Sequence, residues 1–111
     1  MTSQYKDANH EPSVKIAGAR DLDARSGDTV NLRGSVSDPD GSRVTTRWWQ
    51  DVEAGSYPGD VTIGDANATV TTFRVPADAG PGQTIHLILE ATDDGTPTLT
   101  RYQRIIVTVR R

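Results

Sequence analysis

Hydrophobic and polar residues alternate along most of this chain. The clearest example is the segment in which Val30, Leu32, Gly34 and Val36 occupy every second position, with polar residues between them. A period of two is typical of β-strands that bury one face against a core. The same pattern predicts strands at residues 13–17, 29–37, 43–52, 61–63, 69–75, 84–92 and 99–110.

Short turn signals separate these strands, and no segment repeats apolar residues with helical spacing. Seven alternating strands in 111 residues are typical of an immunoglobulin-like β-sandwich, so we expect an all-β fold of about seven antiparallel strands. Residues 12–111 are predicted to form this domain, and the polar residues 1–11 to be a tag or linker. Trp48 occupies the strand position where such sandwiches bury a tryptophan, so we expect it in the core.

Composition excludes several classes of protein. The chain has no cysteine, which excludes disulfides, thiolate zinc sites and a cysteine nucleophile. Its net charge is -3 with both signs interspersed, whereas nucleic-acid binding needs a basic patch or stripe. No apolar run has the length of about 18 residues that a membrane span requires. We therefore expect no nucleic-acid partner and no membrane span, and we expect a monomer.

Two strings between Trp48 and Val109 carry a family resemblance. The first reads WWQDVEAGSYPGDVTI and the second FRVPADAGPGQTIHLILEATDDGTPTLTRYQRIIVTV. These strings resemble the C-terminal domain of bacterial cellulose-binding proteins whose N-terminal domain is similar to nucleoside hydrolases. More broadly, the segments Asn9-His10-Glu11-Pro12 and Asp38-Pro39-Asp40-Gly41 resemble those of PKD and cadherin-like modules.

The resemblance implies a non-catalytic accessory domain of an exported bacterial protein, in an extracellular or periplasmic location. Its partner would be a plant polysaccharide of the cellulose type or the hydrolase-like N-terminal domain of the parent protein. The catalytic residues of such a protein would lie in that N-terminal domain, so the resemblance transfers none to this chain.

One sheet surface is predicted to gather aromatic and polar side chains. If Trp48 points inward, alternation turns Trp49 outward, beside the outward residues of the strands at 84–92 and 99–110. Rings there could stack on sugars while polar side chains bind hydroxyl groups. The same surface could instead dock a neighbouring domain, which Ile88 and Ile106 favour. The candidate ligand-binding residues are Trp49, Tyr57, Tyr102, Arg47, His86, Glu90 and Arg104, with Tyr57 at the margin.

A second group of candidates is acidic. In the predicted topology the loops near residues 38–41 and 93–97 lie at the same end as the start of the domain. Calcium takes 6–8 oxygen ligands and tolerates irregular loops, so a calcium-stabilised structural spacer without ligand recognition is the alternative function. Turn chemistry is the more common role of such aspartates and explains the same residues without an ion. The candidate metal ligands are Asn9, Glu11, Asp38, Asp40, Asp93 and Asp94.

Catalysis has little support in the sequence. Asp51, Glu53, Asp60 and Glu90 could supply a carboxylate pair, but a sandwich of this size offers no deep groove around one. His86 lies within a predicted strand, with no Gly-x-Ser-x-Gly motif nearby. We therefore predict no catalytic residues and no enzymatic activity.

Overall fold

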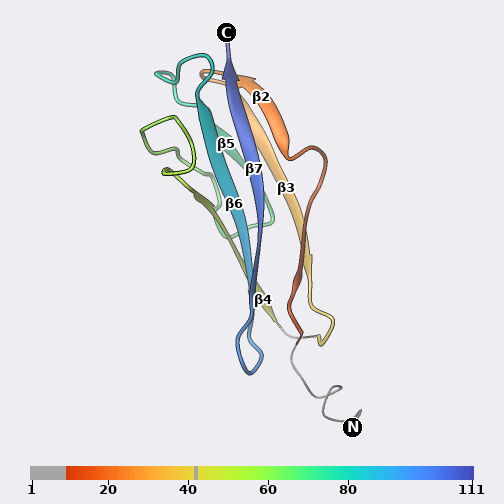
Figure 1. Cartoon of the computed structure of the whole chain (residues 1–111). Helices are drawn as coiled ribbons and strands as arrows, with labels where there is room; N and C mark the ends of the chain where they lie inside the picture. The colour runs from red at the N-terminus through yellow and green to blue at the C-terminus, as the bar shows by residue number, and fades with distance from the viewer. Residues whose placement is uncertain (1–9, 42) are drawn as a thin grey trace.

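The computed structural model describes residues 10–41 and 43–111. Within them lie seven strands and no helix (Figure 1). A three-stranded sheet in the order β1-β3-β5 packs against a four-stranded sheet in the order β2-β7-β6-β4, which confirms the all-β sandwich. The strands are β1 (Ser13–Ile16), β2 (Asp21–Arg25), β3 (Thr29–Ser37), β4 (Val44–Gln50), β5 (Val70–Arg74), β6 (Thr84–Asp93) and β7 (Thr100–Arg110).

β2 is a strand that the sequence pattern did not predict. It pairs in parallel with β7, from Asp21 opposite Ile106 to Arg25 opposite Arg110, so one pairing departs from the expected antiparallel arrangement. Only two apolar residues, Leu22 and Ala24, mark it in the sequence. Asp21, Asp23 and Ala24 are of residue types that are depleted in strands, so the pattern is weak, and pairing with a distant strand determines the conformation of β2.

The predicted strand at residues 61–63 was wrong. Ile63 forms only an isolated bridge with Phe73, because the chain in this region covers the edge of β4 instead. The backbone N–H of Trp48 donates to the carbonyl of Ala66 at 2.7 Å, and the Thr46 hydroxyl donates to the carbonyl of Asn67 at 2.7 Å. These contacts satisfy backbone groups that a bare sheet edge would expose.

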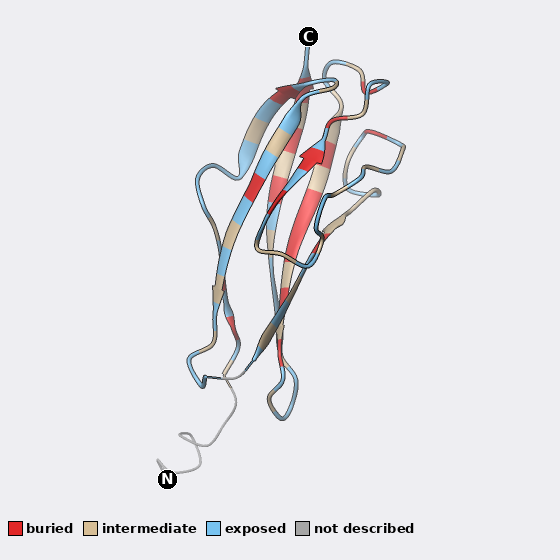
Figure 2. Ribbon diagram, turned by 180° about the vertical axis from the view of Figure 1, so that it is seen from behind, coloured by how far each residue is buried: buried red, intermediate tan, exposed pale blue. Residues whose placement is uncertain are grey.

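The core lies between the two sheets, where the inward side chains of the long strands are buried (Figure 2). Trp48 is 1% exposed, which confirms its predicted place in the core. Leu89 and Phe73 are buried with it. β3 approaches β6 closely at Gly34, where a Cβ atom would lie 2.3 Å from Cδ2 of Leu89. Glycine is therefore needed at this position because there is no space for a side chain.

The other face of the four-stranded sheet points away from the core. β6 and β7 pair along most of their length, from Thr84 opposite Thr108 to Thr92 opposite Thr100. β4 lies on the far side of β6 and pairs with it from Val44 to Gln50. Within the described residues no helix is long and apolar enough to cross a membrane.

Candidate functional site

We call the surface of β2-β7-β6-β4 that points away from the core the outer face. Strand register places Trp49 opposite Ile88, and Ile88 opposite Arg104 on the next strand. The same register aligns Arg47, Glu90 and Tyr102, and it sets His86 opposite Ile106. Because side chains alternate across a strand, these residues share one face. The fold thus brings together six predicted residues: Arg47, Trp49, His86, Glu90, Tyr102 and Arg104.

Tyr57 does not lie at the margin of this face, so that expectation was wrong. Its side chain is 6% exposed and belongs to the core. Its hydroxyl donates to Oδ1 of Asp78 at 2.7 Å, and this hydrogen bond raises the pKa of Tyr57 above its ordinary value. The backbone N–H groups of Ser56 and Tyr57 donate to the carbonyl of Thr84, which holds the loop after β4 against β6.

The apolar part of the outer face is partly covered by its own neighbours. Ile88 lies between Trp49 and Arg104 in the sheet and is only 3% exposed. Tyr102 is 54% exposed, so it is the most exposed large hydrophobic residue of this face. Trp49 is half-buried, and its indole Nε1 is buried without a hydrogen-bond partner among the described residues.

Arg104 organises the polar part of the face. Its Nη1 and Nη2 atoms each donate to Oδ2 of Asp51 at 3.3 Å, and Nη1 lies 2.8 Å from Nδ1 of His86. A guanidinium group can only donate, so His86 accepts at Nδ1 and is neutral, with its proton on Nε2. Burial of the ring and the charge of Arg104 lower the pKa of His86, whereas the charge of Asp51 raises it.

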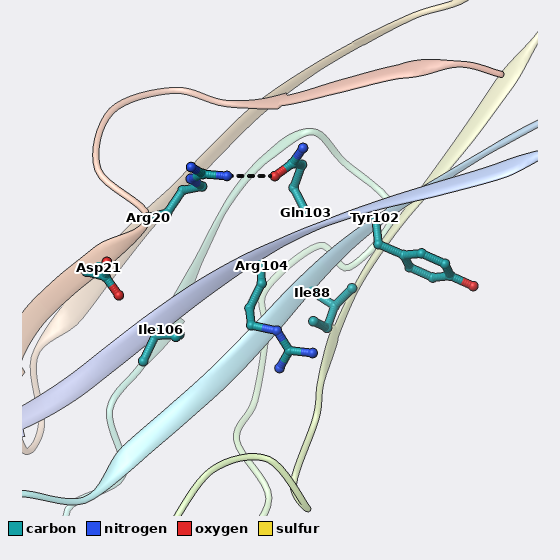
Figure 3. A pocket seen from close by; sticks show the side chains of 7 residues that line it. All are labelled: Arg20, Asp21, Ile88, Tyr102, Gln103, Arg104 and Ile106. Carbon is teal, nitrogen blue, oxygen red and sulfur yellow. Dashed lines mark hydrogen bonds between the residues drawn. The ribbon is translucent and has the colours of Figure 1, made fainter.

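A groove crosses this face where β2 begins beside β7. It has a volume of about 440 Å³. Nη1 of Arg20 donates to Oε1 of Gln103 at 3.2 Å at one side of it (Figure 3). Sequence reasoning did not find Arg20 or Asp21, because β2 was not predicted. It did not find Gln103 either, because alternation along β7 assigns Gln103 to the inward side, opposite Leu89. The groove is lined by Arg20, Asp21, Ile88, Tyr102, Gln103, Arg104 and Ile106.

The β3–β4 and β6–β7 loops, in and beside which Asp38, Asp40, Asp93 and Asp94 lie in the sequence, are at the opposite end of the sandwich from the C-terminus (Figure 1). Asp40 accepts hydrogen bonds from the backbone N–H of His10 and from its Nδ1 atom at 2.9 Å. These two contacts with His10 lower the pKa of Asp40 below its ordinary value. Oδ1 of Asp38 accepts from the backbone N–H of Asp40 at 2.8 Å, while Oδ2 is buried without a hydrogen-bond partner among the described residues.

The remaining acidic candidates also have protein partners. Oδ1 of Asp93 accepts from the backbone N–H groups of Gly95 at 3.1 Å and Leu99 at 3.0 Å, which orders the β6–β7 loop. Oδ1 of Asp94 accepts from the backbone N–H of Arg43 at 3.0 Å, and Glu11 pairs with Arg101.

The calcium site stays a prediction. Across residues 10–41 and 43–111, no group of three or more His, Asp or Glu side chains is arranged to hold a metal ion. The sixth predicted ligand, Asn9, lies outside the described residues.

The chain is similar to a solved structure of a nucleoside hydrolase-related hypothetical protein from Saccharophagus degradans that is associated with carbohydrate metabolism. The TM-score is 0.88 at 34% sequence identity, and the match covers 96% of this chain but 27% of that one. No curated protein shows significant similarity to this chain.

A family comparison covers more than half of the chain. Residues 29–109 match the family described as "Cellulose-binding protein Sde0182, C-terminal domain". The resemblance to the C-terminal domain of cellulose-binding proteins is thereby confirmed, while the broader likeness to PKD and cadherin-like modules stays a prediction. This chain therefore belongs to the Sde0182 C-terminal domain family of cellulose-binding proteins.

Proposed function

We propose that this chain is a non-catalytic accessory domain of a larger exported protein and that it binds glycan through its outer face. The observation that carries the proposal is the composition of the exposed part of that face. Tyr102 presents a ring that is 54% exposed, with guanidinium, carboxylate and amide groups in the groove beside it. Aromatic rings stack on the C–H faces of sugars, and the polar groups can bind hydroxyl groups.

Burial of Ile88 favours glycan over a neighbouring domain. The buried centre of a protein interface is more apolar than its rim, so exposed aliphatic residues at the middle of the face would favour a neighbouring domain. Ile88, the aliphatic residue at the middle of the face, is already 3% exposed, so it offers little further area. Tyr102 is the most exposed large hydrophobic residue of the face, Trp49 and Ile106 are only partly exposed, and polar groups surround them. An exposed ring with polar groups beside it suits a polyhydroxyl ligand.

The family supports the same proposal. Its description contains the words "cellulose-binding", and the similar protein from Saccharophagus degradans is associated with carbohydrate metabolism. This chain spans 27% of the length of that protein, which fits the role of an accessory domain. An extracellular or periplasmic location is part of the proposal, since polysaccharide of this kind lies outside the cell.

Retention on glycan tests the proposal. The purified chain is mixed with insoluble cellulose and is run through affinity gels that contain soluble glucans. We expect the wild-type chain to be retained and Tyr102→Ala to be retained much less, because the exposed ring is lost. Val70→Ala is the matched control, since Val70 is 59% exposed but lies on β5 in the other sheet. A wild-type chain that passes all of these glycans without retention contradicts the proposal.

A further inference from the structure

We propose that the groove beside β7 is the glycan subsite and that it takes a short stretch of a neutral polysaccharide chain, from Tyr102 at one end to Asp21 at the other. This inference rests on the proposed function and names the place and the ligand class within it. It moves the centre of binding away from Trp49 and β4, toward β2 and the adjacent half of β7.

The groove exists because β2 covers only half of the edge of β7. Their pairing begins at Ile106, so in the described chain no strand pairs with the edge of β7 from Thr100 to Ile105. The backbone N–H of Ile106 donates to the carbonyl of Arg20 at 2.7 Å, toward β2. Backbone groups alternate in direction along a strand, so those of Tyr102 and Arg104 point to this same edge. The subsite therefore has main-chain as well as side-chain hydrogen-bonding groups.

The charges of the groove favour a neutral ligand. Arg104 is already engaged by Asp51 and His86, and Arg20 donates to Gln103. The carboxylate of Asp21 has no hydrogen bond or ion pair with any described residue, so its acceptor oxygens remain available to hydroxyl donors. The charge of Asp21 offsets that of Arg20, and the charge of Asp51 offsets that of Arg104, so the groove has little net attraction for an anionic ligand. A sugar hydroxyl both donates and accepts, so it matches a site in which both kinds of group are present.

The length of the groove favours binding of a polysaccharide over binding of a single sugar. Asp21 lies opposite Ile106, and Tyr102 is four residues earlier on β7. At about 3.3 Å per residue the two side chains are separated by roughly 13 Å along the strand, which is longer than one pyranose ring. One sugar unit can therefore stack on Tyr102 while another unit of the same chain reaches Asp21. The volume of about 440 Å³ lies in the range of small-ligand sites.

Titration calorimetry with cellohexaose tests the subsite. We expect Asp21→Ala to bind cellohexaose about tenfold more weakly than the wild-type chain, as for the loss of one hydrogen bond to a charged group. Asp23→Ala is the matched control, because Asp23 lies on the same strand but pairs with Arg110 outside the groove. Arg47→Ala tests the β4 side of the face. Asp23→Ala is expected to bind within twofold of wild type, and Arg47→Ala is expected to lose less affinity than Asp21→Ala. Equal melting midpoints verify that all variants fold.

The ligand class is tested with two further probes. Glucose tests the chain length and is expected to bind far more weakly than cellohexaose. An oligogalacturonate of the same length as cellohexaose tests the charge and is also expected to bind far more weakly. Glucose binding as tight as cellohexaose overturns the chain-length argument, and tighter oligogalacturonate binding overturns the neutral class. If cellohexaose binds but Arg47→Ala weakens it and Asp21→Ala does not, the subsite is wrong while the proposed function stands. If the wild-type chain binds no glycan, the proposed function fails and the subsite fails with it.

Discussion

Arg104 is the residue that connects most elements of the outer face. From β7 it contacts His86 on β6 and Asp51 just after β4, so one side chain joins three neighbouring segments. The ion pair itself is partly exposed, with side-chain exposures of 41% and 27%, and such pairs contribute little to stability. Its main consequence is for His86, which must stay neutral to accept from the guanidinium.

We predict that stability falls on acidification in a way that depends on His86. Its pKa in the folded chain lies below the ordinary value of 6.5, so the unfolded chain binds the proton more readily. The stabilisation is complete above pH 6.5 and is lost as the pH falls through the folded pKa. His86→Gln keeps an acceptor for Arg104 but does not titrate. Its melting midpoint should therefore fall less between pH 7 and pH 5 than that of the wild-type chain.

The other histidine provides the control for this measurement. His10 lies at the far end of the sandwich beside Asp40, so His10→Gln should retain the contribution of His86. An equally steep decline in His86→Gln and the wild-type chain would show that His86 has no part in the acid response.

At the scale of elements, the contact between β3 and β6 limits how the two sheets can pack. A Cβ atom at Gly34 would lie 2.3 Å from Leu89 Cδ2 and 3.2 Å from the carbonyl oxygen of Lys15. Leu89 is 0% exposed, so it has no solvent space into which it can move. The close approach of the sheets therefore depends on glycine at this position.

We predict that Gly34→Ala lowers the free energy of unfolding by about 1–3 kcal/mol, the usual range for overpacking a core. Alanine also restricts the unfolded chain, which favours folding by about 0.4–1 kcal/mol, so the clash outweighs this gain. Urea denaturation measures the difference. Ser35→Ala, at the exposed neighbouring position, should stay within about 0.5 kcal/mol of wild type. Equal stability of the two variants would mean that Leu89 repacks without strain.

The predicted strands agree with β1, β3, β4, β5, β6 and β7, and the two discrepancies are β2 and the segment at 61–63. The segments that became β3, β6 and β7 contain enough alternating positions for their periodicity to be clear. β2 and the segment at 61–63 have two apolar residues each, and hydrogen bonding with distant strands determined their conformations. The error in the short segments affected the site directly, because β2 forms one wall of the groove.

At the scale of the whole molecule, the two alternative functions depend on different regions. The loops that carry Asp38, Asp40, Asp93 and Asp94, here called the acidic end, would serve a calcium-stabilised spacer, and the outer face would serve glycan binding. The acidic end favours a spacer only if its carboxylates hold calcium. Asp38, Asp40, Asp93 and Asp94 each have an oxygen that accepts from a backbone N–H group. This arrangement is the ordinary chemistry of loops that are ordered by aspartate.

We predict the same melting midpoint in EDTA and in millimolar calcium, because these carboxylates already have protein partners. A ligand that binds only the folded chain raises the midpoint with its concentration, so scanning calorimetry of the full chain detects a structural ion directly. Magnesium at equal concentration controls for ionic strength. A midpoint that rises with calcium alone would support the spacer in place of the glycan-binding domain.

The sequence by itself determined the fold class, the buried Trp48 and the common face of Trp49, His86, Tyr102 and Arg104. These follow from alternation, since the side-chain period of a strand is local and each long strand carries it along its own length. The tertiary structure alone decided the burial of Tyr57, the pairing of β2 with β7 and the groove that this pairing leaves beside Tyr102. Those features depend on hydrogen bonds between residues far apart in the chain, and no local pattern specifies which distant partner a short segment will find.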